Sequence, residues 1–358
     1  MRILILNWKD RTHPNAGGAE EYTQQIAKRL VELDHEVTLF VSAVEGRPTT
    51  EVIDGYRVIR RGSRLGVYSE AKRFWGTEGA GSFDVVVDES NTRPFLTPRY
   101  VRTVPVVGLI HQVAREVWHY ETPFPVALAG RYLFEPRWLR EYRDVPVMTI
   151  SESSAGSLRQ YGIKNTTVLP IGADPTENPR VESAPHPTML FLGRLSRNKR
   201  PDHAMEAFRL LRASVPDARL WMMGDGPMRD QLERSLPPGA QVLGHVTWEE
   251  RQRRLGEAHV LVTTSVREGW GLNVSEAAAV GTPTIGYRVD GLRDSIPASG
   301  GHLVDPDPTS MAQAVEEFLA GRLALEPRVS TVPWATVGDH VERVLSDVVD
   351  QGRDLGAA

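Results

Sequence analysis

Two glutamates, Glu268 and Glu276, are separated by seven residues in a stretch that also holds a glycine-rich turn. Gly269 and Gly271 follow a short apolar run, and the next residues, Leu272–Val280, have the pattern of a helix. Because a helix N-terminus presents free backbone N–H groups and a partial positive charge, this turn suits a phosphate or diphosphate. Carboxylates are poor phosphate ligands but good acceptors for sugar hydroxyls. The alternative interpretation is a helix start whose acidic residues merely complement the helix dipole.

Cationic side chains that could bind a diphosphate follow a second apolar run, Met189–Leu192. Arg194 can donate two parallel hydrogen bonds and Lys199 supplies a point charge, and together they would neutralise diphosphate oxygens. When these residues are considered alone, a solvated basic loop explains them equally well.

Three further candidates come from the first half of the chain. His111 follows the apolar run Val106–Ile110, and Gly17 and Gly18 come after the run Ile3–Leu6. In doubly wound sheets, ligands bind at the carboxyl ends of the strands, so all three residues are candidates for a binding site. The chain has ten histidines, and His111 is the one whose position indicates a ligand. For the glycine pair, a simple turn is the alternative.

The elements that must position these residues are short apolar runs that alternate with helical patterns. Runs of this kind predict parallel, doubly wound sheets, because both faces of such strands are buried under helices. We therefore expect an α/β protein with two doubly wound domains, at residues 1–170 and 188–333, joined by a proline-rich linker at 171–187. The other predicted strands are Val37–Val41, Val85–Val87, Val147–Ile150, Leu220–Met223, Val260–Thr263 and Thr284–Tyr287.

A final helix is predicted at about 334–358. Its apolar residues fall at helical spacing and form one stripe, which needs a surface to cover. The residues of this stripe are Val337, Val341, Val344, Leu345 and Val348.

The composition excludes several classes of protein. The net charge of −4 gives no broad basic surface for nucleic acid, and the absence of cysteine rules out disulfides and thiolate chemistry. The N-terminus lacks the apolar core of a signal peptide, and no window reaches the ~18 apolar residues of a membrane span. We expect a soluble cytoplasmic protein of unknown oligomeric state, for which peripheral contact with a membrane remains open.

The segment around the two glutamates resembles the signature of the family 4 glycosyltransferases, retaining enzymes with two Rossmann-like domains that face each other across a cleft, the GT-B fold. The likeness extends along nearly the whole chain. One departure is Arg200, where the family often has glycine after the lysine. The other matching segments are Asn15–Tyr22, Val168–Asp174, Phe191–Phe208, Met222–Pro227 and the final helix, which in the family crosses back to the first domain.

The resemblance implies a role for each candidate. Glu268 would orient the hydroxyls of a hexose-type sugar, and Glu276 would hold the ribose of a UDP- or GDP-sugar. Arg194 and Lys199 would stabilise the departing diphosphate without a metal or other cofactor, and His111 would contact the transferred sugar. The remaining donor contacts would come from Gly17, Gly18, Gly226, His245, Val246, Gly269, Trp270, Gly271 and Leu272.

Two other functions are weighed against this one. An NAD-dependent oxidoreductase would need a G-x-G-x-x-G turn after an early strand, which the residues after Leu6 do not supply. A non-catalytic nucleotide-sugar-binding protein would be favoured if Glu268 or the basic pair were missing.

The acceptor hydroxyl stays open, and a natural product, a glycan and a lipid all fit the sequence. Aromatic and basic residues in Trp118–Arg143 could form an acceptor wall or a membrane-facing patch, although we favour a buried amphipathic helix there.

Overall fold

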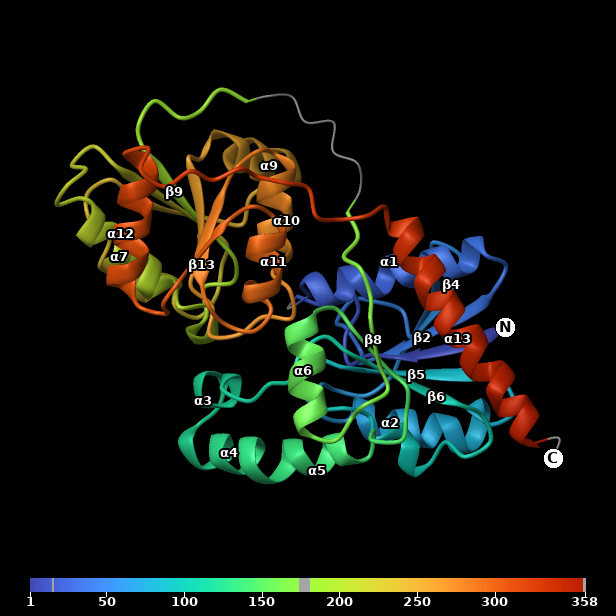
Figure 1. Ribbon diagram of the computed structural model, residues 1–358. Coiled ribbons are helices and arrows are strands. Elements are labelled where there is room, and N and C mark those ends of the chain that lie inside the picture. Colours follow the sequence, from blue (N-terminus) through green and yellow to red (C-terminus); the bar gives the residue numbers. More distant parts are fainter. Residues whose placement is uncertain (15, 174–180, 357–358) are drawn as a thin grey trace. The chain divides into compact units, whose positions relative to one another are not determined.

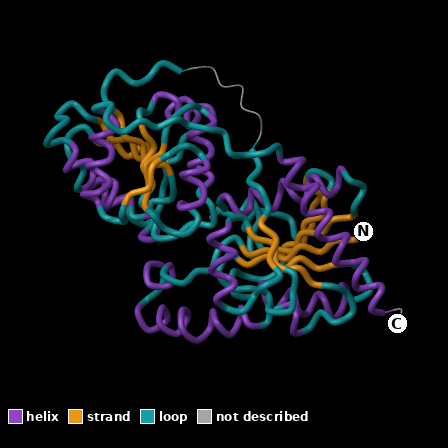
Figure 2. Tube along the Cα trace, viewed as in Figure 1, coloured by secondary structure: helices purple, strands orange, loops and turns teal. Residues whose placement is uncertain are grey.

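The computed structural model describes residues 1–14, 16–173 and 181–356 of the 358-residue chain. Contacts divide the chain into two compact units, each a sheet covered by helices (Figures 1 and 2). The first unit comprises Met1–Ala114, Ala129–Asp174 and Val332–Ala358, and the second comprises Arg115–Leu128 and Pro175–Thr331. The predicted linker at 171–187 and the glycine-rich loop at 15–22 lie partly outside the described residues.

The first unit contains an eight-stranded sheet with the order β3-β4-β2-β1-β5-β6-β7-β8. All neighbouring strands are parallel except β3 and β4. The strands are β1 (Arg2–Leu6), β2 (Glu36–Val41), β3 (Thr50–Ile53), β4 (Tyr56–Arg60), β5 (Val85–Ser90), β6 (Val106–Ile110), β7 (Val147–Thr149) and β8 (Thr166–Val168).

The helices in this part of the chain include two π-helical and one 3₁₀ segment. They are α1 (Gly18–Glu32), α2 (Val67–Phe74), η1 (Trp75–Gly79), η2 (Thr97–Arg99), η3 (Gly130–Phe134), α5 (Glu135–Arg140), α6 (Glu152–Gln160) and α13 (Trp334–Gly356). Another helix, α4 (Phe124–Ala129), belongs to the second unit except for its last residue.

The second unit contains a six-stranded, fully parallel sheet with the order β11-β10-β9-β12-β13-β14. Its strands are β9 (Thr188–Leu192), β10 (Arg219–Met223), β11 (Ala240–Gly244), β12 (Val260–Thr263), β13 (Thr284–Tyr287) and β14 (His302–Val304). Its helices are α3 (Val117–Glu121), η4 (Arg197–Lys199), α7 (Pro201–Leu211), α8 (Arg229–Arg234), α9 (Trp248–Glu257), α10 (Leu272–Ala279), α11 (Leu292–Ala298) and α12 (Pro308–Leu319).

Burial explains which strands the sequence predicts. The central strands β5 and β12 are buried along their whole length, and each begins with an apolar run, Val85–Val87 in β5 and Val260–Val262 in β12, that predicts a strand. Sequence analysis missed the edge strand β3, whose residues are only exposed or half-buried. The Asp54-Gly55 dipeptide could have revealed this strand, because it forms the turn between β3 and β4 with φ values of 47° and 86°. A turn with two successive positive φ values favours Asp-Gly and is typical of a tight hairpin.

The final helix, α13, packs against α1 in the first unit. Arg29 of α1 donates to Asp339 of α13 at 2.9 Å. Trp334, the first residue of α13, packs its indole against Gly172, where a Cβ on residue 172 would be 2.1 Å from a ring carbon. The predicted stripe needs one correction, because Val349 rather than Val348 is buried and Val344 is half-buried. The buried positions are Val337, Val341, Leu345 and Val349.

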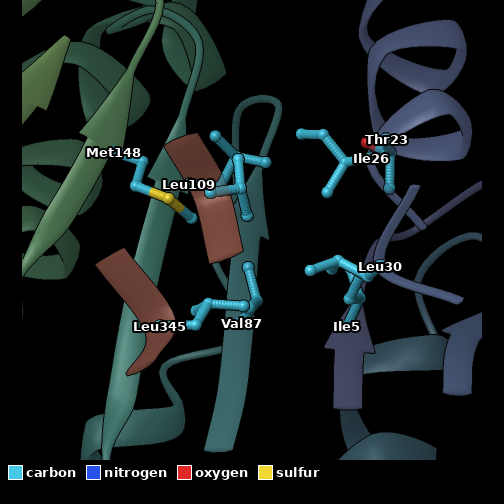
Figure 3. Close-up of a pocket in the computed structure, with 9 residues that line it drawn as sticks. Ile5, Thr23, Ile26, Leu30, Val87, Leu109, Met148 and Leu345 are labelled. Carbon is cyan, nitrogen blue, oxygen red and sulfur yellow. The ribbon is translucent and has the colours of Figure 1, made fainter. Parts of the chain in front are cut away.

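A small pocket lies inside the first unit, between α1, α13 and the sheet (Figure 3). Its lining is apolar apart from Thr23, whose hydroxyl is engaged with Glu89, so the pocket does not suit a diphosphate and is a gap in the core. Among the described residues, none of the helices combines the length and hydropathy needed to cross a bilayer.

Candidate functional site

The loops after β9 and β12 form one connected structure in the second unit. The two strands are neighbours in a parallel sheet, so their carboxyl ends lie at the same edge. The Thr264 hydroxyl contacts the carbonyl oxygens of Lys199 and Arg200 at 2.9 and 2.7 Å. The Val266 N–H donates to the Asn198 carbonyl at 2.8 Å. These hydrogen bonds hold the loop that contains Arg194 and Lys199 against the loop that contains Glu268.

Lys199 and Glu268 form an ion pair at this junction. The Ser265 hydroxyl donates to the same oxygen, Oε1 of Glu268, at 2.6 Å. The carboxylate is mostly buried, with 14% of its side chain exposed against 27% for the lysine. Behind it, the Glu268 N–H donates to the Asp290 carbonyl at 3.0 Å, which fixes the backbone. Two residues that are 69 positions apart are therefore held together with defined orientation.

The N-terminus of α10 opens beside this pair. Gly271 is the N-cap residue with φ 95°, a left-handed conformation that favours glycine, and Leu272 is the first helical residue. The first turn carries no acidic side chain, so the partial positive charge of the helix is uncompensated there. The Asn273 side chain donates to the Leu192 carbonyl at 2.9 Å and ties the helix to the end of β9. This end of α10 can therefore receive an anion.

Two more of the predicted residues border this turn. Gly269 is buried, and the half-buried Trp270 donates from its indole N–H to Ser275 at 2.9 Å. That bond holds the Trp270 ring along α10, so the ring shapes the loop.

Arg194 lies on the loop after β9, and its side chain is exposed. Gly226, predicted as a donor contact, packs against this loop, since a Cβ there would lie 2.5 Å from the Leu195 carbonyl oxygen. Leu195 in turn donates its N–H to the Asp225 carbonyl at 2.9 Å. The structure thus gives Gly226 a supporting role for the Arg194 loop.

Glu276 has a partner that sequence analysis did not anticipate. It forms an ion pair with Arg251 of α9, and both side chains are partly exposed, at 22% and 30%. The Arg251 guanidinium also lies over the Trp248 ring, 5.6 Å from its centroid. Arg251 therefore holds the Glu276 carboxylate against α9.

His245 and Val246 directly follow β11. His245 is exposed and Val246 is half-buried. Just before them, the Gly244 carbonyl accepts the Gly224 N–H at 2.9 Å, which joins the ends of β11 and β10. The two residues thus lie at the same edge of the sheet as the Lys199–Glu268 pair.

A second polar cluster lies in the first unit, at the start of α1. The Gly17 N–H donates to Oε2 of Glu20 at 2.7 Å, and Lys9 lies 3.1 Å from the same oxygen. Asn91 donates to the other oxygen at 3.0 Å. Burial raises the pKa of Glu20, and the nearby Lys9 ammonium opposes that rise. Gly18, the first residue of α1, is exposed.

His111 is buried beside this cluster. Its Nε2 lies 3.1 Å from Oε1 of Glu89, a fully buried glutamate at the end of β5 that sequence analysis missed. The Thr23 hydroxyl contacts the other oxygen of Glu89 at 2.5 Å. The Tyr22 ring packs edge-on against the imidazole, 5.5 Å between centroids. A usable signal was the position of Glu89 at the carboxyl end of a predicted strand next to the strand of His111.

Arg200, where the resembling family often has glycine, adopts φ 49°. That left-handed conformation favours glycine and explains the family's preference. In this chain the Arg200 guanidinium donates to the hydroxyl of Tyr120 in α3 at 2.6 Å. Glu116, the residue before α3, forms a second contact there, an ion pair with the buried Arg267 at 3.0 Å. Arg200 thus adopts a backbone conformation that favours glycine, and its side chain forms a contact to α3 that a glycine could not form.

Comparisons with known proteins show that the chain is similar to glycosyltransferases. Residues 16–177 match the family described as Glycosyltransferase Family 4, and residues 186–321 match Glycosyl transferases group 1. The glycogen synthase of Mycobacterium tuberculosis is 24% identical over 96% of this chain and 94% of its own. A GDP-mannose-dependent alpha-(1-6)-phosphatidylinositol dimannoside mannosyltransferase of the same organism is 32% identical, over 45% of each chain.

Solved structures show the same fold. The crystal structure of Anabaena Alr3699/HepE in complex with UDP-glucose superposes with a TM-score of 0.65 at 16% identity and covers all of both chains.

Proposed function

Because the chain belongs to the family 4 glycosyltransferases of the GT-B fold, which transfer a sugar from a nucleotide sugar, we propose the finer chemistry of its reaction. The donor is a UDP- or GDP-hexose, the acceptor is a hydroxyl group, and the anomeric configuration is retained. Neither a metal nor another cofactor takes part. One relative and one solved neighbour support a nucleotide diphosphate donor, since the first is GDP-mannose-dependent and the second binds UDP-glucose.

The observation that carries this proposal is the Lys199–Glu268 pair beside the open N-terminus of α10. A cation and a helix N-terminus favour a diphosphate, and the adjacent carboxylate can accept hydrogen bonds from sugar hydroxyls. Paired carboxylates in glycosidases flank the bond that breaks, as acid and nucleophile. Here Glu268 is engaged with a lysine and a serine, so it orients the sugar and does not attack it.

In the proposed reaction, the bond between the anomeric carbon and the diphosphate oxygen breaks, and its electron pair stays on that oxygen. Arg194, Lys199 and the α10 N-terminus stabilise the developing charge. The acceptor oxygen forms its bond to the anomeric carbon on the face that the diphosphate leaves. Its proton passes to a phosphate oxygen of the leaving group, so no protein base is consumed.

The other residues bind and orient the donor. Glu276, held by Arg251, accepts the ribose hydroxyls, and the backbone at His245 and Val246 meets the base. His111 contacts the transferred sugar, and Gly17 and Gly18 allow close approach of the first unit's backbone to the diphosphate. The exposed Arg194 side chain and the Gly269–Leu272 turn complete the diphosphate site.

A panel of nucleotides and nucleotide sugars tests this proposal. We expect UDP or GDP to raise the melting temperature more than ADP or NAD, because they occupy the site and stabilise the folded state. We also expect slow hydrolysis of one UDP- or GDP-hexose in EDTA, lost in Glu268→Ala while nucleotide binding persists. Stabilisation by NAD alone, or hydrolysis that needs a divalent cation, would contradict it. Nucleotide-sugar binding without turnover by any acceptor would favour the non-catalytic alternative.

A further inference from the structure

Arg267, the residue before Glu268, is buried although it carries a charge. Its side chain is 6% exposed, and sequence analysis gave it no role. The guanidinium forms ion pairs with two carboxylates, that of Asp290 at 2.5 Å and that of Glu116 at 3.0 Å. Because a buried charge is costly unless it is paired, these two contacts fix the position of the guanidinium.

Asp290 joins the side chain of Arg267 to the backbone of Glu268. It lies in the loop after β13, the strand that pairs with β12. Its carboxylate, on a side chain that is 12% exposed, binds Arg267, and its carbonyl oxygen accepts the Glu268 N–H at 3.0 Å. Arg267 and Glu268 are adjacent, so one residue holds this part of the chain at two points. Rotation of the backbone at Glu268 is therefore restricted.

The next residue, Gly291, packs directly against Glu268. A Cβ at Gly291 would lie 2.3 Å from the Glu268 carbonyl oxygen, and its φ is 81°, in the region that favours glycine. At the other end of the glutamate, Lys199 and Ser265 bind one oxygen of the carboxylate. The backbone and the carboxylate of Glu268 are thus held by separate sets of contacts.

We propose that Arg267 is a positioning residue for sugar transfer, which holds Glu268 in place through Asp290 and does not bind the donor itself. The inference rests on the proposed function, in which the Glu268 carboxylate meets the sugar hydroxyls. Direct binding of the diphosphate by Arg267 is the poorer interpretation, because its guanidinium is buried beside two carboxylates that would repel a phosphate. Displacement of a substrate-orienting group by about 1 Å can lower a rate about 100-fold, so precise support of Glu268 matters.

A double-mutant cycle with Arg267→Gln and Asp290→Asn tests the proposal. Each substitution removes one charge of the buried pair, and neither removes the backbone carbonyl that accepts the Glu268 N–H. Arg267→Lys keeps the positive charge and is the rescue variant. Arg293→Gln is the matched control, because Arg293 contacts the other oxygen of Asp290 at 3.0 Å and half of its side chain is exposed. The measurements are the melting temperature, the affinity for UDP or GDP, and kcat/KM for the sugar donor.

We expect Arg267→Gln and Asp290→Asn each to lower kcat/KM roughly 10- to 100-fold, while the affinity for UDP or GDP changes less than about twofold. The double variant should be little worse than either single variant, because the two residues act through one contact. Arg267→Lys should retain more turnover than Arg267→Gln, and Arg293→Gln should match the wild type.

A purely structural arginine gives a different pattern, in which the melting temperature falls but the folded Arg267→Gln protein keeps the wild-type kcat/KM. That result, additive losses in the double variant, or an equal loss of nucleotide affinity and turnover would overturn the proposal. If Arg267→Gln does not fold, wild-type kcat/KM in Asp290→Asn overturns it instead. Absence of sugar transfer by the wild type would overturn the proposed function and this inference with it, whereas turnover that every variant retains would overturn the inference alone.

Discussion

Replacing Glu268 with glutamine should separate sugar transfer from nucleotide binding. The glutamine keeps the size of the side chain but removes the charge that pairs with Lys199. A hydrogen bond to a charged group contributes about 1.5–3 kcal/mol, so loss of the contact to the sugar should lower kcat/KM by roughly 10- to 150-fold. The affinity for UDP or GDP should stay the same or rise, because the variant frees the Lys199 ammonium and removes a negative charge beside the diphosphate site.

The assay pairs calorimetric titration with the nucleoside diphosphate and a coupled measurement of nucleotide release from the sugar donor. Lys199→Gln is the informative companion variant, because both nucleotide affinity and turnover should fall when the cation is removed. Glu206→Gln, which breaks an exposed pair with Arg209 (2.9 Å), is the matched control and should change neither. The reasoning is refuted if Glu268→Gln weakens nucleotide binding as much as turnover, or leaves turnover unchanged.

Three other predictions follow from single contacts. Glu89→Gln should replace the charged acceptor beside His111 with a neutral amide and lower turnover about tenfold while nucleotide affinity persists; equal activity would make Glu89 purely structural. Gly172→Ala should lower the melting temperature by about 4–8 °C, the effect of ~2 kcal/mol of overpacking, whereas Gly76→Ala, with open space around it, should not. Burial, and secondly a nearby arginine, lower the pKa of His203, so its contribution to stability is present above about pH 6.5 and lost as pH falls. The melting temperature of His203→Gln should therefore decline less between pH 7 and pH 5 than that of the wild type.

Much of the fold could be predicted from the sequence because the central strands are buried on both faces. β1, β5 and β12 each contain an apolar run of three or four residues, and their parallel packing follows from the helical patterns between them. The edge strand β3 could not be found this way, since none of its residues is buried. Edge strands lack the apolar signal that central strands carry.

The candidate site could be predicted as a set of residues but not as a set of contacts. Lys199 and Glu268 belong to different loops, and only the placement of β9 next to β12 brings them together. In the same way, the pairing of Glu89 with His111 depends on β5 lying beside β6. Strand order is a property of the whole sheet, so a local pattern around either residue does not reveal its partner.

The exposed helix at 124–140 shows another limit of pattern reading. Its aromatic and aliphatic residues suggested burial, because apolar residues at helical spacing usually face a core. The π-helical turn shifts the register by one residue and turns Tyr132, Leu133 and Phe134 outward. If a period of 3.6 residues is assumed along the whole run, part of this exposed segment is assigned to the buried side of the helix.

The central claim is that this site transfers a sugar with retention and without a metal. Proton NMR of the first product formed from a UDP- or GDP-hexose in EDTA tests it most directly. From an α-configured donor, we predict an α-configured product that appears before any β anomer and whose formation is lost in Glu268→Ala. Initial formation of the β anomer, or a reaction that stops in EDTA and returns with a divalent cation, would contradict the account.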